Sequence, residues 1–248
     1  MLYLILSDLH GNTTALSAVL RRVRRKHFDG TFLLGDLVGY GAGPNQVVED
    51  VRRRLPGPVW KIRGNHDKVV AGIETGENFN QAALQAARWT AGKLTAANLR
   101  FVRELPQGPI GAPGEVTLCH GSPADEDQYL FSVYEAWEAF NLWDGQVAFF
   151  GHTHVPSLFV AQGREVRVAL LSGTTGSIRI EPGLRYLINP GSVGQPRDRD
   201  PRAAYMTFDT EKRLVRWHRV PYSVQRAGQL ILDAGLPKVL ADRLALGV

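Results

Sequence analysis

Five short polar patches of this chain have the residue types that bind metal ions. They contain five of its seven histidines and read Asp8-Leu9-His10, Gly35-Asp36, Gly64-Asn65-His66-Asp67, Cys119-His120-Gly121 and Gly151-His152-Thr153-His154. Carboxylate, amide oxygen and imidazole are common ligands of first-row metals, and a pair of such ions can cleave phosphate esters. One patch alone is weak evidence, because Asp and Asn also favour turns and helix caps. Their shared format and order predict a two-metal phosphate-cleaving site.

Short apolar stretches precede these patches, and we expect each stretch to be a buried strand. They are residues 2–6, 31–34, 59–62, 116–119 and 147–150. In an α/β sheet the carboxyl ends of the strands meet at one crevice, so separate strands can deliver ligands to one place. Asp8 and Asp36 are 36 − 8 = 28 residues apart, and Asp36 and Asn65 are 65 − 36 = 29 apart. Each interval is about the length of one βαβ step.

The rest of the chain supplies the elements around these strands. Apolar residues spaced three and four apart predict helices over about 13–23 and 44–55, so the chain begins β-α-β-α-β. Residues 71–110 predict a helical insertion near the site. From residue 157 the pattern is rich in strands, and after Ser223 it returns to helix. No linker or repeat is visible, so we expect one domain over residues 1–248.

The composition places few limits on the partners. With 248 residues, 44 % hydrophobic and 21 % charged, the chain has ordinary globular composition. Its single cysteine, Cys119, permits no internal disulfide, and neither a targeting segment nor a membrane-spanning run is visible. We therefore expect a cytoplasmic protein with no membrane partner. The net charge of +5 favours anionic partners but does not separate phosphate esters from nucleic acid.

The five patches together resemble the calcineurin-like metallophosphoesterase superfamily, whose pattern is D-x-H, G-D, G-N-H-D/E, H and G-H-x-H. The resemblance implies a four-layer α/β/β/α sandwich of two mixed β-sheets flanked by helices. It implies one metal held by Asp8, His10, Asp36 and His154, and a second held by Asp36, Asn65, His120 and His152. His66 is then the catalytic residue that protonates the leaving oxygen. Asp67 is expected to act with His66 by orienting it or its loop.

One departure from the superfamily narrows the function. Its protein Ser/Thr phosphatases have G-D-x-V-D-R-G, in which the second Asp supports the catalytic His and the Arg binds phosphate. Here Gly39 and Tyr40 stand at those two positions. A protein phosphatase is therefore disfavoured, and the partner of His66 stays open.

Two further segments, residues 39–45 and 189–198, resemble a small bacterial and archaeal branch of the superfamily. That branch includes phosphodiesterases and, in some members, hydrolases of diadenosine polyphosphates. The resemblance implies substrate contacts by Tyr40, Asn189 and Arg197. The alternatives are that 189–198 is only a tight Gly/Pro loop and that Tyr40 packs in the core.

The sequence thus predicts hydrolysis of a phosphate mono- or diester by a hydroxide that two metal ions activate. The ions are Mn, Fe or Zn, in divalent or trivalent form, and the expected substrate is a small nucleotide such as a diadenosine polyphosphate. The alternatives are a nuclease and a non-catalytic protein that binds a phosphate ligand through metal. The physiological substrate, the native metal pair, the oligomeric state and any lid role of 71–110 stay open.

Overall fold

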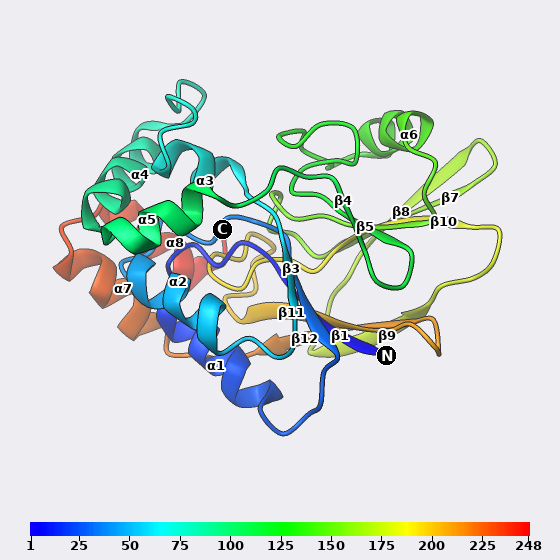
Figure 1. Cartoon of the computed structure of the whole chain (residues 1–248), viewed down its shortest axis with the longest axis horizontal. Coiled ribbons are helices and arrows are strands. Elements are labelled where there is room, and N and C mark those ends of the chain that lie inside the picture. Colours follow the sequence, from blue (N-terminus) through cyan, green and yellow to red (C-terminus); the bar gives the residue numbers. More distant parts are fainter.

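The computed structural model describes residues 1–248, and two six-stranded mixed sheets form its centre (Figure 1). The first sheet has the strand order β3-β2-β1-β11-β12-β9. Its strands are β1 (Leu2–Leu6), β2 (Gly30–Leu33), β3 (Val59–Lys61), β9 (Thr175–Arg179), β11 (Ala203–Asp209) and β12 (Leu214–Val220). β1, β2 and β3 are parallel, and β11, β12 and β9 are added by antiparallel pairing.

The second sheet has the order β4-β5-β6-β10-β7-β8. Its strands are β4 (Ile110–Ala112), β5 (Val116–Leu118), β6 (Val147–Phe149), β7 (Ser157–Gln162), β8 (Glu165–Leu170) and β10 (Arg185–Asn189). Side chains from both sheets, such as Ile5, Phe32, Phe149 and Ile188, form one buried apolar cluster. The two sheets therefore pack face to face, and the predicted sandwich of two mixed sheets flanked by helices is confirmed.

Helices cover the outer face of each sheet, as Figure 1 shows. Beside the first sheet lie α1 (Thr13–Val23), α2 (Pro44–Arg53), α3 (Asn65–Val70), α4 (Gln81–Lys93), α5 (Ala96–Arg103), α7 (Val224–Asp233) and α8 (Lys238–Leu246). α1 packs on β11 and β12, and α7 packs on α1. The second sheet is covered by α6 (Val133–Leu142), which contacts β7 and β8.

Local chemistry explains where these helices begin. The side chains of Asn12, Asn80 and Thr95 accept hydrogen bonds from the first turns of α1, α4 and α5, and each satisfies an N–H that the helix leaves free. Pro44 stands in the first turn of α2, where its missing N–H costs nothing.

The stretch 71–110 contains α4 and α5, which pack against α2 and α3, so it is helical and adjoins the site. It also ends in β4, an edge strand of the second sheet that the sequence reading did not foresee. β4 has only three residues and lies among prolines, so it has no periodic pattern. It pairs with β5 as a short antiparallel hairpin across residues 113–115.

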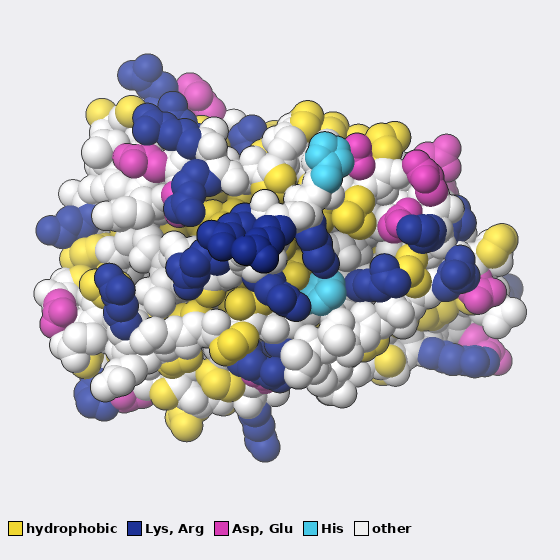
Figure 2. Space-filling model, turned by 90° about the horizontal axis from the view of Figure 1, so that it is seen from below, with side chains coloured by type: hydrophobic (Ala, Val, Ile, Leu, Met, Phe, Trp, Pro, Cys, Tyr) yellow, Lys and Arg dark blue, Asp and Glu magenta, His cyan; other side chains and the backbone are white.

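The surface charge is uneven. The run of basic residues at 21–26 begins in the last turn of α1 and continues into the turn after it, and α1 lies at the bottom of Figure 1. Figure 2 shows that lower face, where Lys and Arg side chains gather across the middle. None of the helices combines the length and the apolar character that crossing a bilayer requires.

Candidate metal centre

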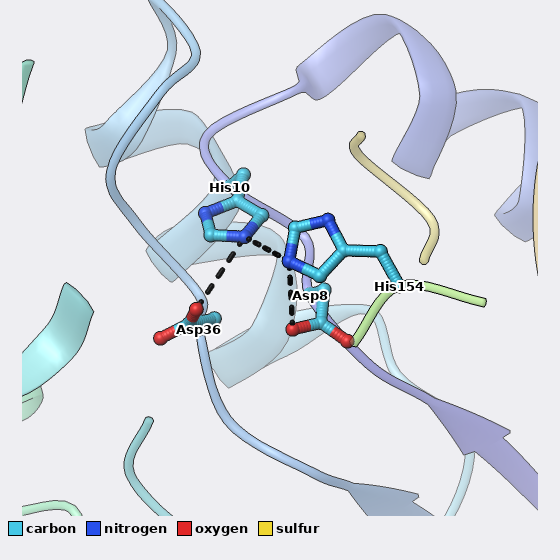
Figure 3. A group of neighbouring side chains, drawn as sticks. All are labelled: Asp8, His10, Asp36 and His154. Atoms are coloured by element: carbon cyan, nitrogen blue, oxygen red, sulfur yellow. Dashed lines mark hydrogen bonds and ion pairs between the residues drawn. The ribbon is translucent and has the colours of Figure 1, made fainter. Parts of the chain in front are cut away.

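The loops after β1, β2 and β6 bring four predicted ligands into one buried cluster, formed by Asp8, His10, Asp36 and His154 (Figure 3). Their donor atoms all lie within 4.8 Å of one another. His154 Nε2 is 3.4 Å from Asp8 Oδ1, and His10 Nε2 is 3.4 Å from Asp36 Oδ2. The two Nε2 atoms are 3.1 Å apart. One small cation between them could contact all four side chains.

A second cluster shares one carboxylate with the first and consists of Asp36, His120 and His152. Asp36 Oδ2 lies 3.6 Å from His120 Nε2, so this one oxygen faces both groups. Asn65 joins the second cluster, because its Oδ1 is 3.2 Å from His120 Nε2. The structure thus brings together all seven residues that were predicted as ligands.

Hydrogen bonds behind the rings fix the histidine tautomers. The Nδ1 atoms of His10, His120 and His154 face the backbone carbonyls of Val38, Leu34 and Gln195 at 3.2, 2.7 and 2.6 Å. A carbonyl only accepts, so each Nδ1 carries the ring hydrogen and each Nε2 offers a lone pair to the cluster. Lone pairs on His10 and His154 then face each other at 3.1 Å. A cation between them converts this repulsion into attraction.

Buried polar atoms without hydrogen-bond partners also indicate that the clusters bind a cation. Asp8 Oδ2, Asp36 Oδ2 and His152 Nε2 are buried and make no hydrogen bond within the protein. Burial raises the pKa of Asp8 to about 7 and also raises the pKa of Asp36. Burial lowers the pKa of His10, His152 and His154. Buried carboxylates and neutral imidazoles fit a bound cation, which stabilises the ionised acids and uses the free nitrogens.

The backbone at the ligands is strained. Eight non-glycine residues have positive φ, and five of them are predicted ligands: Asp8, His10, Asp36, His152 and His154. Such conformations cost about 1–3 kcal/mol each and persist where the surrounding structure enforces them. Here they turn the chain sharply after each strand, so that the side chains point inward.

Asp67 holds the loops that carry the ligands. Its carboxylate accepts hydrogen bonds from the N–H groups of Leu37, Val38 and Gly64 at 3.0 to 3.2 Å, and the side chain is fully buried. Burial raises its pKa to about 6, and these backbone donors counter the shift. Asp67 therefore orients the loop of Asp36 and the start of α3, and it contacts no open space where a substrate could bind.

His66 stands beside the clusters with one free ring nitrogen. Its ring packs against those of Tyr40 and Phe79, with centroids 4.4 and 4.5 Å away, and its Nδ1 is buried without a partner. A Cβ at Gly39 would lie 2.7 Å from that Nδ1 and φ there is +125°, so an aspartate does not fit. No carboxylate side chain from this position can support His66, and aromatic packing orients it instead.

The segment 189–198 reaches the site through Arg197. The Arg197 guanidinium donates to the Tyr40 hydroxyl at 3.2 Å, and its backbone N–H bonds to the carbonyl of His154. Burial lowers the pKa of His66, and the positive charge of Arg197 adds to this shift. Asn189 is fully buried, and it donates to Gly151 O at 2.6 Å and to the Thr153 hydroxyl at 3.0 Å. Asn189 thus supports the loop of His152 and His154 from behind.

A pocket of about 630 Å³ opens beside the clusters. The residues that line it include Asn65, His66, Phe79, Tyr129 and His152. Its volume is typical of small-molecule sites. The sequence did not mark Tyr129 as a residue of the site, and Phe79 also packs against the hydrophobic core. The sequence around Tyr129 did not indicate a place at the pocket, because that loop is acidic and has no regular pattern.

Known proteins resemble this chain in sequence and in fold. The model of the calcineurin-like phosphoesterase superfamily domain matches residues 1–213. The chain is 36 % identical over 248 residues to the uncharacterized protein MJ0912 of Methanocaldococcus jannaschii, covering 98 % of this chain and 97 % of that one. A metallophosphoesterase from Sphaerobacter thermophilus has a TM-score of 0.84 at 36 % identity, covering 100 % and 99 % of the two chains. The hypothetical protein PH1004 from Pyrococcus horikoshii shares the fold, with a TM-score of 0.79 at 18 % identity, covering 100 % and 98 %.

Fold and site together define a metal-dependent hydrolase of phosphoric esters. The chain belongs to the calcineurin-like phosphoesterase superfamily. The match extends over nearly the whole chain, so the resemblance that the five patches indicated is confirmed.

Proposed function

We propose that this protein hydrolyses a small nucleotide-type phosphate mono- or diester, such as a diadenosine polyphosphate, with the help of two metal ions. One observation carries the proposal: two buried donor clusters share Asp36 and adjoin a pocket of about 630 Å³. A carboxylate between two imidazole groups is suited to bridge a metal pair.

The first ion would be held by Asp8, His10, Asp36 and His154, and the second by Asp36, Asn65, His120 and His152. Bound there, the pair supplies charge neutralisation for the phosphate and lowers the pKa of an attacking water. Mixed imidazole and carboxylate donors suit Mn, Fe and Zn alike, so the ligands do not choose among these metals.

Two neighbouring side chains have roles toward the substrate. His66 has a ring nitrogen free of protein partners at the pocket wall, and we assign it the protonation of the leaving oxygen. Arg197, held beside Tyr40, supplies a guanidinium for a phosphate oxygen. Tyr40 orients both groups, since its ring packs on His66 and its hydroxyl accepts from Arg197.

The surface charge disfavours the nuclease alternative. Glu74, Glu77 and Asp127 line the outer part of the pocket, where they repel the flanking phosphates of a polynucleotide. α1 and the basic run at its end lie at the bottom of Figure 1, whereas the segments 73–80 and 121–131 lie toward the top. A complete ligand set and a free nitrogen on His66 favour turnover over a purely binding role.

A metal reconstitution screen tests the proposal. Chelator-stripped protein is loaded with Mn²⁺, Fe²⁺, Zn²⁺ or Mg²⁺ and assayed with bis-p-nitrophenyl phosphate, p-nitrophenyl phosphate, diadenosine tetraphosphate and single-stranded DNA. We expect metal-dependent turnover of the small esters and little of the DNA. Bound metal without turnover of any ester would contradict the proposal, and preferred cleavage of DNA would favour the nuclease.

A further inference from the structure

Two aromatic side chains stand in solvent beside the metal centre without a packing role in the core. The Tyr129 ring lies on the ring of His152, with centroids 3.8 Å apart and planes 27° apart. Phe131 stacks on Tyr129 at 5.3 Å and 8°. Tyr129 is 42 % exposed and Phe131 is 59 % exposed. Large apolar rings gain stability from burial, so the fold does not explain a stacked pair that stays in water.

The position of this pair relates it to the substrate pocket. Tyr129 lines the pocket together with His152 and His66, and Phe79 lines it from the segment 73–80. The Tyr129 ring also lies directly against His152, one of the predicted metal ligands. If the phosphate of a substrate binds at the two clusters, the organic group attached to that phosphate therefore lies next to Tyr129 and Phe79.

The loop that carries Tyr129 is held in place by ion pairs. Arg63 binds Glu126 at 2.9 Å, and the buried Lys68 of α3 contacts both Glu126 and Asp127. The hydroxyl of Ser122 accepts from the N–H groups of residues 124 and 125. A fixed aromatic surface loses little entropy when a ligand stacks on it.

We propose that the outer face of Phe131, which Tyr129 supports from behind, is a stacking platform for a nucleobase of the substrate ester. This inference rests on the proposed function and names the part of the substrate that lies beyond the phosphate. Bases stack on aromatic side chains through their π-faces, and loss of one such ring weakens binding severalfold to about a hundredfold. The amide side chains of Asn78 and Asn80 also line the pocket and can bond to the edge of a base.

The nucleobase belongs to a short nucleotide rather than to a nucleic acid. The carboxylates of Glu74, Glu77 and Asp127 beside the platform oppose further phosphates along a strand. Lys68 pairs with Glu74 and Asp127. One positive charge beside three carboxylates leaves this rim of the pocket negative.

Inhibition by two matched ligands tests the platform. Adenosine 5′-monophosphate and ribose 5-phosphate share the phosphate and the sugar and differ by the adenine. Each competes with bis-p-nitrophenyl phosphate on the metal-loaded protein, and we expect adenosine 5′-monophosphate to inhibit about tenfold more tightly. This ratio falls toward one in Phe131→Ala and in Tyr129→Leu. It persists in Tyr129→Phe, which keeps the ring, and in Tyr134→Ala, an exposed tyrosine of α6 outside the stack.

Metal content measured for every variant separates a lost platform from a disturbed His152. Equal inhibition constants in the unaltered protein, or a ratio that Phe131→Ala leaves intact, would overturn the inference while the esterase function stands. If no ester is turned over, quenching of ethenoadenosine monophosphate fluorescence on binding still tests the platform by itself. An oligoadenylate that competes more tightly than the mononucleotide would overturn the assignment to a short nucleotide.

Discussion

Replacing Asp67 by alanine separates a positioning role from a catalytic one. The carboxylate is fully buried and accepts from three backbone N–H groups, of Leu37, Val38 and Gly64. A buried donor left without an acceptor costs about 1–3 kcal/mol, so three give an upper limit of about 9 kcal/mol. Water entering the space of the lost side chain recovers part of this. We expect the free energy of unfolding to fall by about 4 kcal/mol.

Metal affinity changes through the same contacts. Leu37 follows Asp36 and Gly64 precedes Asn65, so the loss of the carboxylate loosens one ligand of each cluster. Partners that orient metal ligands from behind are typically worth about 10- to 100-fold in affinity. We therefore expect Asp67→Ala to bind Mn²⁺ about 10- to 100-fold more weakly.

Calorimetric unfolding and equilibrium dialysis with Mn²⁺ measure these two effects without any turnover. Asp67→Asn keeps one acceptor oxygen and is expected between the alanine variant and the unaltered protein. Asp233→Ala, an exposed acid on α7, is the matched control and should stay within about 0.5 kcal/mol. An Asp67→Ala protein with unchanged stability and metal affinity but no hydrolysis would refute this reasoning and make Asp67 a catalytic residue.

Four other substitutions test separate parts of the structure. His66→Ala should keep its metal content and lose about 100-fold or more in kcat. Asp36→Ala should instead lose bound metal. Normal turnover by His66→Ala would rule out proton transfer by His66. Lys68→Met removes a buried ammonium that pairs with Glu74, Glu126 and Asp127, and thermal unfolding should show a loss of about 2–3 kcal/mol, or roughly 5–10 °C in Tm. An unchanged Tm would mean that these carboxylates do not hold the loop to α3. His218→Phe should abolish the part of the pH dependence of stability that comes from this histidine.

The His218 prediction follows from its surroundings. Burial lowers its pKa to about 4, and the charges of Lys26 after α1, Arg22 on α1 and Arg216 on β12 add to the shift. Tyr205 of β11 stacks on its ring, and Thr175 of β9 lies 3.3 Å from Nδ1. The unfolded chain binds a proton near pH 6.5, so between pH 6.5 and 4 it holds more protons than the folded protein.

Stability due to this histidine is therefore complete above pH 6.5 and is lost as the pH falls toward 4. For a half-buried ring we expect a loss of about 1–2 kcal/mol. Urea unfolding at pH 4.5 and 7 measures it in both proteins. His218→Phe keeps the stacking on Tyr205, and an equal pH dependence in this variant would contradict the assignment.

The sequence by itself determined the donor types, their order and the strands that precede them. A short apolar run followed by Asp, Asn or His is a local pattern, so the core strands that precede the five patches were predictable. The seven ligands could be named because the five patches together occur in this order in one superfamily.

Tertiary structure alone decided how these groups work. Val38 and Gln195 fix the tautomers of His10 and His154 through backbone carbonyls that no sequence pattern marks. Packing determines left-handed backbone at residues such as His152, because isolated chains avoid it. Arg197 meets Tyr40 from 157 positions away. Such contacts depend on how the two sheets pack together, and the local sequence does not indicate which distant residues will meet.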